Sequence, residues 1–365
     1  MQNQFDIAEQ FTPQGRVLAV HEFGNGNIND TYLVTTDSDE EPYFVLQRIN
    51  THVFKQPNLI MRNMRIFSEH IRRRASLEGH HWEMPRVLHA GDGQDFHIDV
   101  ENNFWRAISY IQRACSYDTI RDLEHARQVG HAIGSFHYLI SDLPVETLAD
   151  TLEGFHIMPS YLQQYDQVSS RNGWTASAEV RLAMEFIAAR RDWAHILENA
   201  RKQGKLQLRP IHGDPKVNNV MIEETTGRAI SLVDLDTVKP GLIHYDIGDC
   251  MRSGCNPLGE ETEDWESVRF ETQIGEAILT GYLTQARQFL ASADYEYLFD
   301  SIRLLTFELA VRFFTDYLAG NVYFKVKHPE HNLLRALVQF KLTESIEAHE
   351  AEIRTIIQSM VYRAV

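Results

Sequence analysis

The sequence predicts an α+β fold of two lobes, a small antiparallel β-rich N-terminal lobe and a large, mainly helical C-terminal lobe. Three β-prone runs separated by turn-forming residues lie within the first 50 positions, which is typical of an antiparallel meander. After about residue 118, apolar residues recur at helical spacing instead. The pattern changes near 112–118, so we place the lobes at residues 1–112 and 113–365.

The N-terminal lobe is expected to combine one long helix with a small sheet. The helix is expected at 57–75, because apolar residues such as Ile60, Met64 and Phe67 fall on one of its faces. The strands are expected at 16–20, 31–36, 43–49, 87–90 and 104–111.

The C-terminal lobe is expected to be helical with one short β interruption. Amphipathic helices are expected at 122–140 and 180–198, and several more within 266–350. The β-prone positions are 211, 220–222 and 230–233. The last two runs suit a short hairpin, and together the three runs bracket a segment rich in polar side chains.

Composition excludes several classes of partner. Lys plus Arg is 35 and Asp plus Glu is 51, giving a net charge of −16. Such a surface repels nucleic acid and anionic membranes, so we expect neither as a partner. The three cysteines form no CxxC pair, and with no secretory signal and no long apolar span they indicate a cytoplasmic protein. The scattered histidines lack HExxH spacing, so no zinc site is expected.

The polar segment carries the most informative motif of the chain. Residues 212–219 read His-Gly-Asp-Pro-Lys-Val-Asn-Asn, and Asp234 follows the run 230–233. His-x-Asp-x₄-Asn followed by a strand-borne Asp is the order of the catalytic loop and metal ligands in the protein-kinase-like fold. The motif therefore predicts a bilobal protein-kinase-like fold and an ATP-dependent phosphotransferase.

Each side chain of the motif suits one task in phosphoryl transfer. Asp214 is expected to orient the acceptor hydroxyl and take its proton. Asn219 and Asp234 offer hard oxygen ligands, which Mg²⁺ prefers. His212 is expected to hold the loop by hydrogen bonds rather than to act as a base.

Two further carboxylates have less definite roles. Asp236 is expected to contact the substrate, although a second metal ligand or a surface turn are alternatives that its position leaves open. Asp246, like its neighbour Asp249, is expected to brace the catalytic loop.

The N-terminal lobe contains a candidate phosphate loop. Gly24-Asn-Gly26-Asn27-Ile-Asn29 lies between two expected strands, so its backbone N–H groups could bind phosphates, although a plain hairpin turn explains the same residues. The third strand should carry a lysine for the α- and β-phosphates, but it reads Gln47-Arg48. Alternation puts these two on opposite faces, so Arg48 can serve as the cofactor-binding cation only if a bulge shifts the strand. Glu69 is a candidate partner for such a cation or an exposed helix residue.

These segments resemble the aminoglycoside phosphotransferase/choline kinase family, and the resemblance covers most of the chain. Within that family the chain looks most like N-acetylhexosamine 1-kinases, which also have Gln in Val-Leu-Gln-Arg. The matching segments are Gly26-Asn-Ile-Asn29-Asp-Thr-Tyr32, Val45-Leu-Gln-Arg-Ile-Asn50, Lys216-Val-Asn-Asn219, Asp234-Leu-Asp-Thr-Val238 and Val311-Arg312-Phe with Tyr323-Phe-Lys325.

The resemblance implies a function and further site residues. Such enzymes use ATP and Mg²⁺ to phosphorylate the anomeric hydroxyl of GlcNAc or GalNAc, which Asp214 would contact. Arg312 and Tyr323 would hold the sugar. The adenine would meet the backbone near Tyr110 and Ile111.

Three functions are therefore open. The first is a sugar 1-kinase whose partner is a small-molecule sugar, working as a monomer or weak homodimer. The second is a kinase of the same fold for an aminoglycoside, choline or ethanolamine, or homoserine. The third is a nucleotide-binding protein without catalysis. A cationic acceptor would need acidic side chains converging on the cleft, whereas an acetamido sugar would need hydrogen-bonding and aromatic groups.

Overall fold

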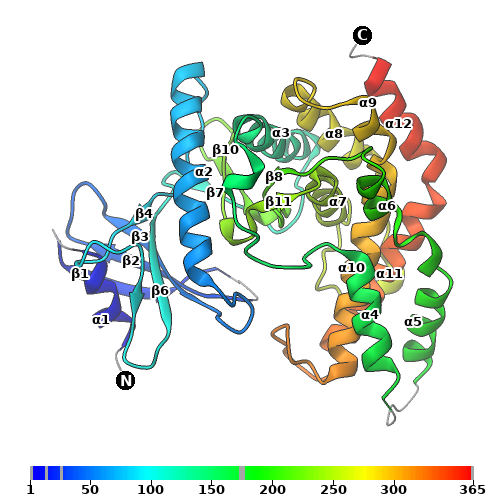
Figure 1. Ribbon diagram of the computed structural model, residues 1–365, viewed down its shortest axis with the longest axis horizontal. Coiled ribbons are helices and arrows are strands. Elements are labelled where there is room, and N and C mark those ends of the chain that lie inside the picture. The colour runs from blue at the N-terminus through cyan, green and yellow to red at the C-terminus, as the bar shows by residue number, and fades with distance from the viewer. Residues whose placement is uncertain (1–2, 13–14, 25–27, 172–176, 363–365) are drawn as a thin grey trace.

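The computed structural model describes residues 3–12, 15–24, 28–171 and 177–362. A twisted β-sheet with the short helix α1 (Gln4–Ala8) forms one end of the molecule, and a helical body forms the other (Figure 1). The long helix α2 (Pro57–Glu78) lies between them.

The N-terminal sheet is antiparallel throughout, which confirms the predicted meander. Its order is β1-β2-β3-β6-β4, with β5 also paired to β6. The side chains of Val34, Phe44 and Leu46 are buried in its small core. The strands are β1 (Val17–Glu22), β2 (Asp30–Thr36), β3 (Tyr43–Ile49), β4 (Val87–Leu88), β5 (His97–Ile98) and β6 (Phe104–Ser109).

Helix α2 forms where the apolar spacing predicts it and runs three residues further than expected. Pro57 opens it at the first turn, where the missing N–H costs nothing. Gly79 ends it in the left-handed conformation at φ 69°, which a residue with a Cβ adopts only with strain. Its buried stripe, including Met64, Phe67 and Ile71, joins the main hydrophobic core of the molecule.

The helical body is built on one tight contact between two helices and on a central helix that packs against three others. Helix α3 (Leu123–Ile140) crosses α8 (Thr272–Ala286) at Gly130 and Gly281. A Cβ on Gly130 would lie 1.9 Å from the Ile278 carbonyl oxygen, so only glycine permits this approach. The central α10 (Leu298–Ala319) packs against α4 (Met158–Ser169), α7 (Ile243–Gly254) and α11 (His331–Ala348).

Two small sheets interrupt the helices. The predicted hairpin is present as β9 (Val220–Glu223) and β10 (Ala229–Leu232), and β7 (Ala114–Cys115) extends it. Strand β8 (Arg209–Ile211) pairs with β11 (Lys239–Gly241). Because β7 belongs to this second sheet, we propose that the C-terminal lobe begins at about residue 113.

One predicted helix is wrong in its extent. The segment expected at 180–198 breaks into α5 (Ala178–Ala188) and α6 (Ile196–Lys202) around a 3₁₀ turn at Arg191–Trp193. Arg190 leaves the helical conformation at φ −118°, and its guanidinium binds Glu347 of α11 at 2.6 Å. The ion pair with Glu347 lies at the break between the two helices, and the amphipathic pattern of the sequence does not predict this break.

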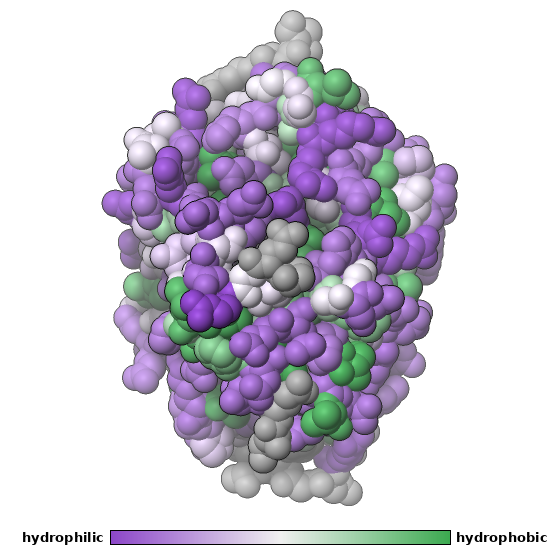
Figure 2. Space-filling model, turned by 90° about the vertical axis from the view of Figure 1, so that its left-hand side faces the viewer, coloured by the Kyte–Doolittle hydropathy of each residue, from purple (hydrophilic) through white to green (hydrophobic). Residues whose placement is uncertain are grey.

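The remaining elements are α9 (Ser292–Glu296), α12 (Glu350–Tyr362) and the 3₁₀ turns Glu9–Phe11, Val145–Thr147, Val217–Asn219, Leu235–Thr237 and Trp265–Ser267. The face at the sheet end is mostly hydrophilic, with only small scattered hydrophobic areas (Figure 2). Among the described residues, no helix combines the length and apolarity that a membrane span requires.

Candidate active site

A cavity of about 700 Å³ is lined by residues of both the N-terminal sheet and the helical body. Side chains of β3 and β6 contribute one wall, and the catalytic-motif loop, the segment after β10 and helix α10 contribute the other. The structure brings most of the predicted site residues to this cavity. They are Gly24, Asn29, Tyr110, Ile111, Asp214, Asn219, Asp234, Asp236, Arg312 and Tyr323.

The loop that carries Asp214 is held from behind by a buried carboxylate. Asp246 on α7 accepts the backbone N–H of His212 at 2.7 Å and of Gly213 at 2.8 Å. His137 of α3 donates to the same carboxylate at 2.7 Å. His212 itself donates through Nε2 to the Val233 carbonyl at 3.0 Å, which ties the loop to the segment after β10. The structure thus places His212 and Asp246 behind the loop, outside the cavity lining.

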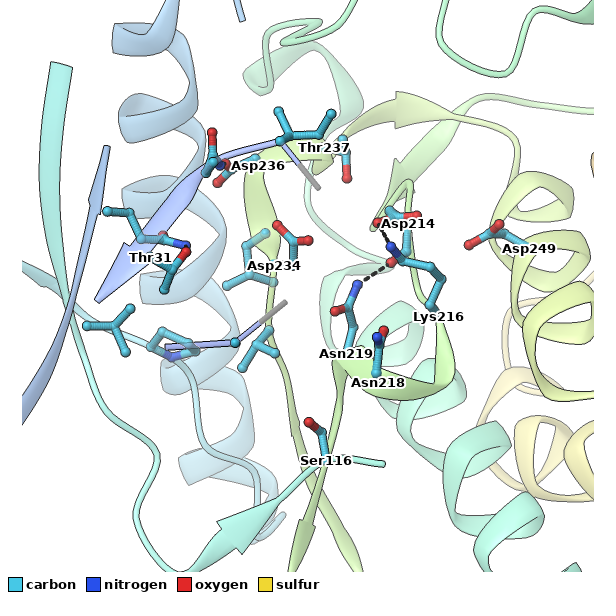
Figure 3. A pocket seen from close by; sticks show the side chains of 18 of the residues that line it. Thr31, Ser116, Asp214, Lys216, Asn218, Asn219, Asp234, Asp236, Thr237 and Asp249 are labelled. Atoms are coloured by element: carbon cyan, nitrogen blue, oxygen red, sulfur yellow. Dashed lines mark hydrogen bonds and ion pairs between the residues drawn. The ribbon is translucent and has the colours of Figure 1, made fainter. Parts of the chain in front are cut away.

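The Asp214 carboxylate projects into the cavity beside Lys216 (Figure 3), with 3.1 Å between Oδ2 and Nζ. Burial among protein atoms raises the pKa of Asp214 to about 6, with further contributions from the Asp249 and Asp234 carboxylates, while Lys216 opposes the rise. A carboxylate with a pKa near the operating pH is well suited to accept a proton. About a quarter of the side chain, 26%, remains open to solvent in the cavity, so a substrate can reach it.

This geometry predicts the pH dependence of activity. Asp214 acts as a base only when deprotonated, so kcat/KM should rise with pH through about 6 and level off above it. The substitution Lys216→Met removes the charge that lowers this pKa, so the rising limb should move to higher pH. The measurement is kcat/KM from pH 5 to 9, with Lys205→Met, an exposed lysine bonded to Tyr297, as the matched control. An unchanged limb in Lys216→Met would contradict the assignment.

Asn219 and Asp234 face the cavity from adjacent segments and fit a magnesium ion. Asn219 donates Nδ2 to the Asp214 carbonyl at 2.7 Å, which leaves its Oδ1 as a possible ligand. Asp234 sits at φ 61°, a left-handed conformation unusual for a residue with a Cβ. Within the described residues its carboxylate has no hydrogen-bond partner, and burial, then Asp236, raises its pKa. A bound cation would offset the unfavourable free energy of a buried, negatively charged Asp234.

The donor set is characteristic of Mg²⁺ rather than of a fully protein-ligated ion. Among the described residues there is no group of three or more His, Cys, Asp or Glu side chains able to hold a metal. Mg²⁺ is usually held by one or two carboxylates together with water and substrate phosphates. One carboxylate and one amide oxygen meet that requirement.

The predicted phosphate loop lies only partly within the described residues. Gly24 lines the cavity at φ 75°, whereas Gly26 and Asn27 lie outside the described residues. Asn29 donates Nδ2 to Asp236 at 2.7 Å and accepts the Asn50 N–H at 2.9 Å. The end of this loop is therefore fixed to both β3 and the segment after β10.

The expectation that Arg48 binds the cofactor is corrected by the structure. Strand β3 pairs regularly with β2 and β6 at this position, so no bulge turns Arg48 toward the cavity. Its guanidinium instead pairs with Asp30, with 2.9 Å between Nε and Oδ2, and lies over the Trp105 ring. Glu69 on α2 is exposed and does not line the main cavity.

The wall contributed by the sheet contains a cation that was not predicted from the sequence, Arg106. It lies on β6 directly opposite Gln47, and its side chain is only 1% exposed. It donates to Gln47 Oε1 through Nε at 2.9 Å and Nη2 at 2.6 Å. A charged residue within the otherwise apolar run of β6 was the available signal, because buried charges need partners.

Asp236, the predicted substrate contact, lines the cavity and is held by residues of the N-terminal lobe. It is 2% exposed, and its two carboxylate oxygens are engaged by Arg106 and Asn29 of the N-terminal lobe. Asp236 therefore links the sheet to the segment that carries Asp234.

The end of the cavity near α10 contains another cation, which is half-buried. Arg312 lies among the rings of Phe155, Tyr161 and Phe324, with 5.0 to 5.5 Å from its guanidinium carbon to their centroids. Tyr323 also lines this end. Asp316 accepts the Tyr323 N–H at 2.8 Å, which fixes the loop that follows α10.

His156 and Glu308 also line this end and were missed in the sequence. His156 lies 2.9 Å through Nδ1 from Glu308 and 2.6 Å through Nε2 from the Gly213 carbonyl. Both ring nitrogens of His156 are therefore held by oxygen atoms of its neighbours. Burial opposes its charge, but Glu308 outweighs it and raises the pKa of His156. The second oxygen of Glu308 is buried without a partner among the described groups.

The opposite end of the cavity suits a planar base. Tyr110 and Ile111 directly follow β6 and line the cavity there. The Tyr110 ring packs edge-on against Phe23 and Tyr43, each at 6.0 Å between centroids. Apolar walls with backbone groups at hand are characteristic of small-molecule sites.

Comparison with known proteins identifies the fold and family. Residues 19–289 match the phosphotransferase enzyme family. The chain is similar to the structure of an aminoglycoside phosphotransferase from Alicyclobacillus acidocaldarius, with 14% identity, a TM-score of 0.59 and 94% of each chain covered. It is also similar to a microcompartment-associated aminopropanol kinase, with 16% identity, a TM-score of 0.60, and 95% of this chain and 98% of the kinase covered.

A third similar structure is a spectinomycin phosphotransferase in complex with ADP and spectinomycin, with 12% identity and a TM-score of 0.55. The match covers 96% of this chain and 99% of that one. At such identities the likeness concerns the fold alone, and it confirms the predicted protein-kinase-like fold.

Proposed function

Because the chain belongs to the phosphotransferase enzyme family, we propose that it transfers the γ-phosphoryl group of ATP to the anomeric 1-hydroxyl of an N-acetylhexosamine. The products are the sugar 1-phosphate and ADP. The observation that carries the choice of a neutral acceptor is the Arg312 guanidinium at the α10 end of the cavity, enclosed by aromatic rings with 13% of its side chain exposed.

The charges at this end disfavour a cationic acceptor. His156, whose pKa is raised by Glu308, and Arg312, whose Nη1 lies 4.0 Å from Glu308, both pair with this one carboxylate, so Glu308 is not left as a free anion for an amine. Coulombic repulsion is strong where solvent is scarce, so an ammonium group would bind poorly beside Arg312. A neutral sugar instead offers oxygens to Arg312 and a hydroxyl or N–H donor to the free oxygen of Glu308. The surrounding rings offer apolar faces to the pyranose.

The transfer follows from the groups around Asp214. The sugar oxygen attacks the γ-phosphorus while its proton passes to the Asp214 carboxylate. The bond between the γ-phosphorus and the β–γ bridging oxygen breaks, and ADP leaves with that electron pair. Asn219 and Asp234 would hold Mg²⁺, which neutralises phosphate charge when bound. Lys216, whose Nζ lies 3.1 Å from Asp214, can stabilise the negative charge of the transferred phosphoryl group.

A second acceptor class is supported by a different observation. Asp214, Asp234, Asp249, Glu260 and Glu308 all line the cavity. Acidic side chains in a cleft attract amines, and two of the similar structures are named for amine-bearing acceptors, aminoglycosides and aminopropanol. A kinase for an aminoglycoside, an amino alcohol or homoserine is therefore the alternative.

An acceptor screen separates these functions. Initial rates of ADP formation should be highest with GlcNAc or GalNAc, and ³¹P NMR should show the phosphate on the anomeric oxygen. Choline, ethanolamine, homoserine and kanamycin should give rates near background. A faster rate with any amine would contradict the sugar assignment, and ATP binding without turnover on any acceptor would point to a non-catalytic protein.

Arg312→Gln tests the residue that carries the assignment. Loss of a charged hydrogen-bond donor should raise the KM for the sugar about 10-fold or more, with little change in the KM for ATP. Arg303→Gln is the control, because Arg303 lies on the same helix but packs over Trp193 and pairs with Asp300. Equal changes in both KM values would contradict a direct contact with the acceptor.

A further inference from the structure

We propose that Arg106 replaces the missing third-strand lysine. Its guanidinium binds the α- and β-phosphates of the nucleotide, and Asp236 holds it in position. This inference rests on the proposed use of ATP and is independent of the identity of the acceptor.

The position of Arg106 follows from the register of the sheet. Gln47 on β3 and Arg106 on β6 are directly opposite in an antiparallel pair. Directly opposite residues project from the same face of a sheet, and both line the cavity together with Thr31 and Asp234. The positive charge therefore lies on β6 instead of on β3, and it projects from the same face of the sheet, toward the cavity.

Gln47 is oriented to support this cation. Its Nε2 donates to Thr31 at 3.0 Å, so its Oε1 faces Arg106 and accepts two of its N–H groups. A lysine at position 47 would place a second positive charge against the buried guanidinium, which is unfavourable. Glutamine at 47 and arginine at 106 therefore form a compatible pair.

The guanidinium retains binding capacity on its remaining side. Its Nη2 pairs with Asp236, but its Nη1 meets only the Met64 sulfur at 3.1 Å among the described residues. A thioether is a weak acceptor. Phosphate oxygens, by contrast, match the planar fork of arginine and form strong charge-assisted bonds.

Asp236 couples this cation to the rest of the nucleotide site. It follows Asp234, the proposed metal ligand, by two residues, and its other oxygen accepts from Asn29 at the end of the glycine loop. One buried carboxylate thus joins the phosphate loop, the cation and the metal-binding segment. In this arrangement Asp236 performs the task expected of a helix carboxylate such as Glu69.

Nucleotide binding tests the proposal without any acceptor. The affinities of ADP and of adenosine are measured by isothermal titration calorimetry with Mg²⁺ present. Arg106→Met should weaken ADP about 10- to 100-fold, the effect of losing charged hydrogen bonds, while adenosine, which has no phosphates, should change by less than about 2-fold. Gln47→Lys combined with Arg106→Met should recover part of the ADP affinity, because it returns the cation to β3.

Two further variants complete the test. Arg48→Met removes an arginine from the opposite face of the same sheet and should leave ADP binding unchanged. Because Arg106→Met leaves the Asp236 carboxylate buried without its cation, Arg106→Met with Asp236→Asn is measured as well, and it should show the same selective loss of ADP. Circular dichroism establishes that each variant is folded.

The outcomes separate this proposal from the proposed function. ADP affinity within about 2-fold of the wild type in both Arg106 variants, or an equal loss for adenosine, would overturn the role of Arg106. A wild-type protein that binds no ADP would overturn both proposals. Selective loss of ADP affinity in a protein that phosphorylates no sugar would support Arg106 while refuting the proposed acceptor.

Discussion

Asp214→Asn should lower kcat with the sugar acceptor about 10²- to 10⁴-fold, the usual contribution of a positioned general base. The amide keeps the shape of the carboxylate but cannot accept the acceptor proton. Burial already raises the pKa of Asp214 to about 6, so neutralising this side chain should not destabilise the fold. The measurement is single-turnover formation of sugar phosphate at pH 8, where the wild-type carboxylate is ionised.

The control separates chemistry from binding. ADP affinity in Asp214→Asn should stay within about 3-fold of the wild type, because the substitution leaves the Arg106, Asn219 and Asp234 side chains in place. Asp166→Asn, an exposed carboxylate paired with Arg191, should have no effect on the rate. Near-normal kcat in Asp214→Asn would refute the proposed mechanism, whichever acceptor is used.

The sequence predicted those helices, strands and loops that are marked by patterns of neighbouring residues. The strands β1 to β3 alternate and are separated by turn residues, and the catalytic loop is a contiguous motif. The same is true of α2, whose start and end are marked by Pro57 and Gly79. For these elements, the pattern of neighbouring residues is sufficient to predict the type of element.

The missed parts of the site depend on contacts between distant residues. Gln47 and Arg106 are 59 positions apart, and only the pairing of β3 with β6 places them together. His156 and Glu308 are 152 positions apart. The sequence showed a charged residue in each apolar segment, but it did not show which partner would neutralise it.

The error at Arg48 has the same origin. Alternation along β3 places Gln47 and Arg48 on opposite faces, and β3 is the strand where kinases carry a lysine. In the proposed nucleotide site, a positive charge is needed at the sheet wall of the cavity, and a residue on the adjacent strand β6 can supply it. The break between α5 and α6 likewise accompanies a distant partner, since Arg190 pairs with Glu347.

Asp246→Ala should destabilise the protein by about 3–5 kcal/mol, the cost of removing one partner from a buried charged network. The His212 and Gly213 N–H groups and His137 would all lose their acceptor in a region that solvent does not reach. Because the first two belong to the catalytic loop, kcat should also fall, by about 10²-fold for a displacement of about 1 Å.

Urea unfolding and kcat at a temperature where the variant remains folded measure the two effects separately. Asp142→Ala is the matched control, because Asp142 also pairs with a histidine, His70, and in addition with Arg74, but is 60% exposed. Exposed pairs contribute about 0–1 kcal/mol, so this control should change stability little and kcat not at all. If Asp246→Ala were as stable as the control and fully active, the loop would be positioned by its own backbone. The link from α3 through Asp246 to the Asp214 loop would then have no part in catalysis.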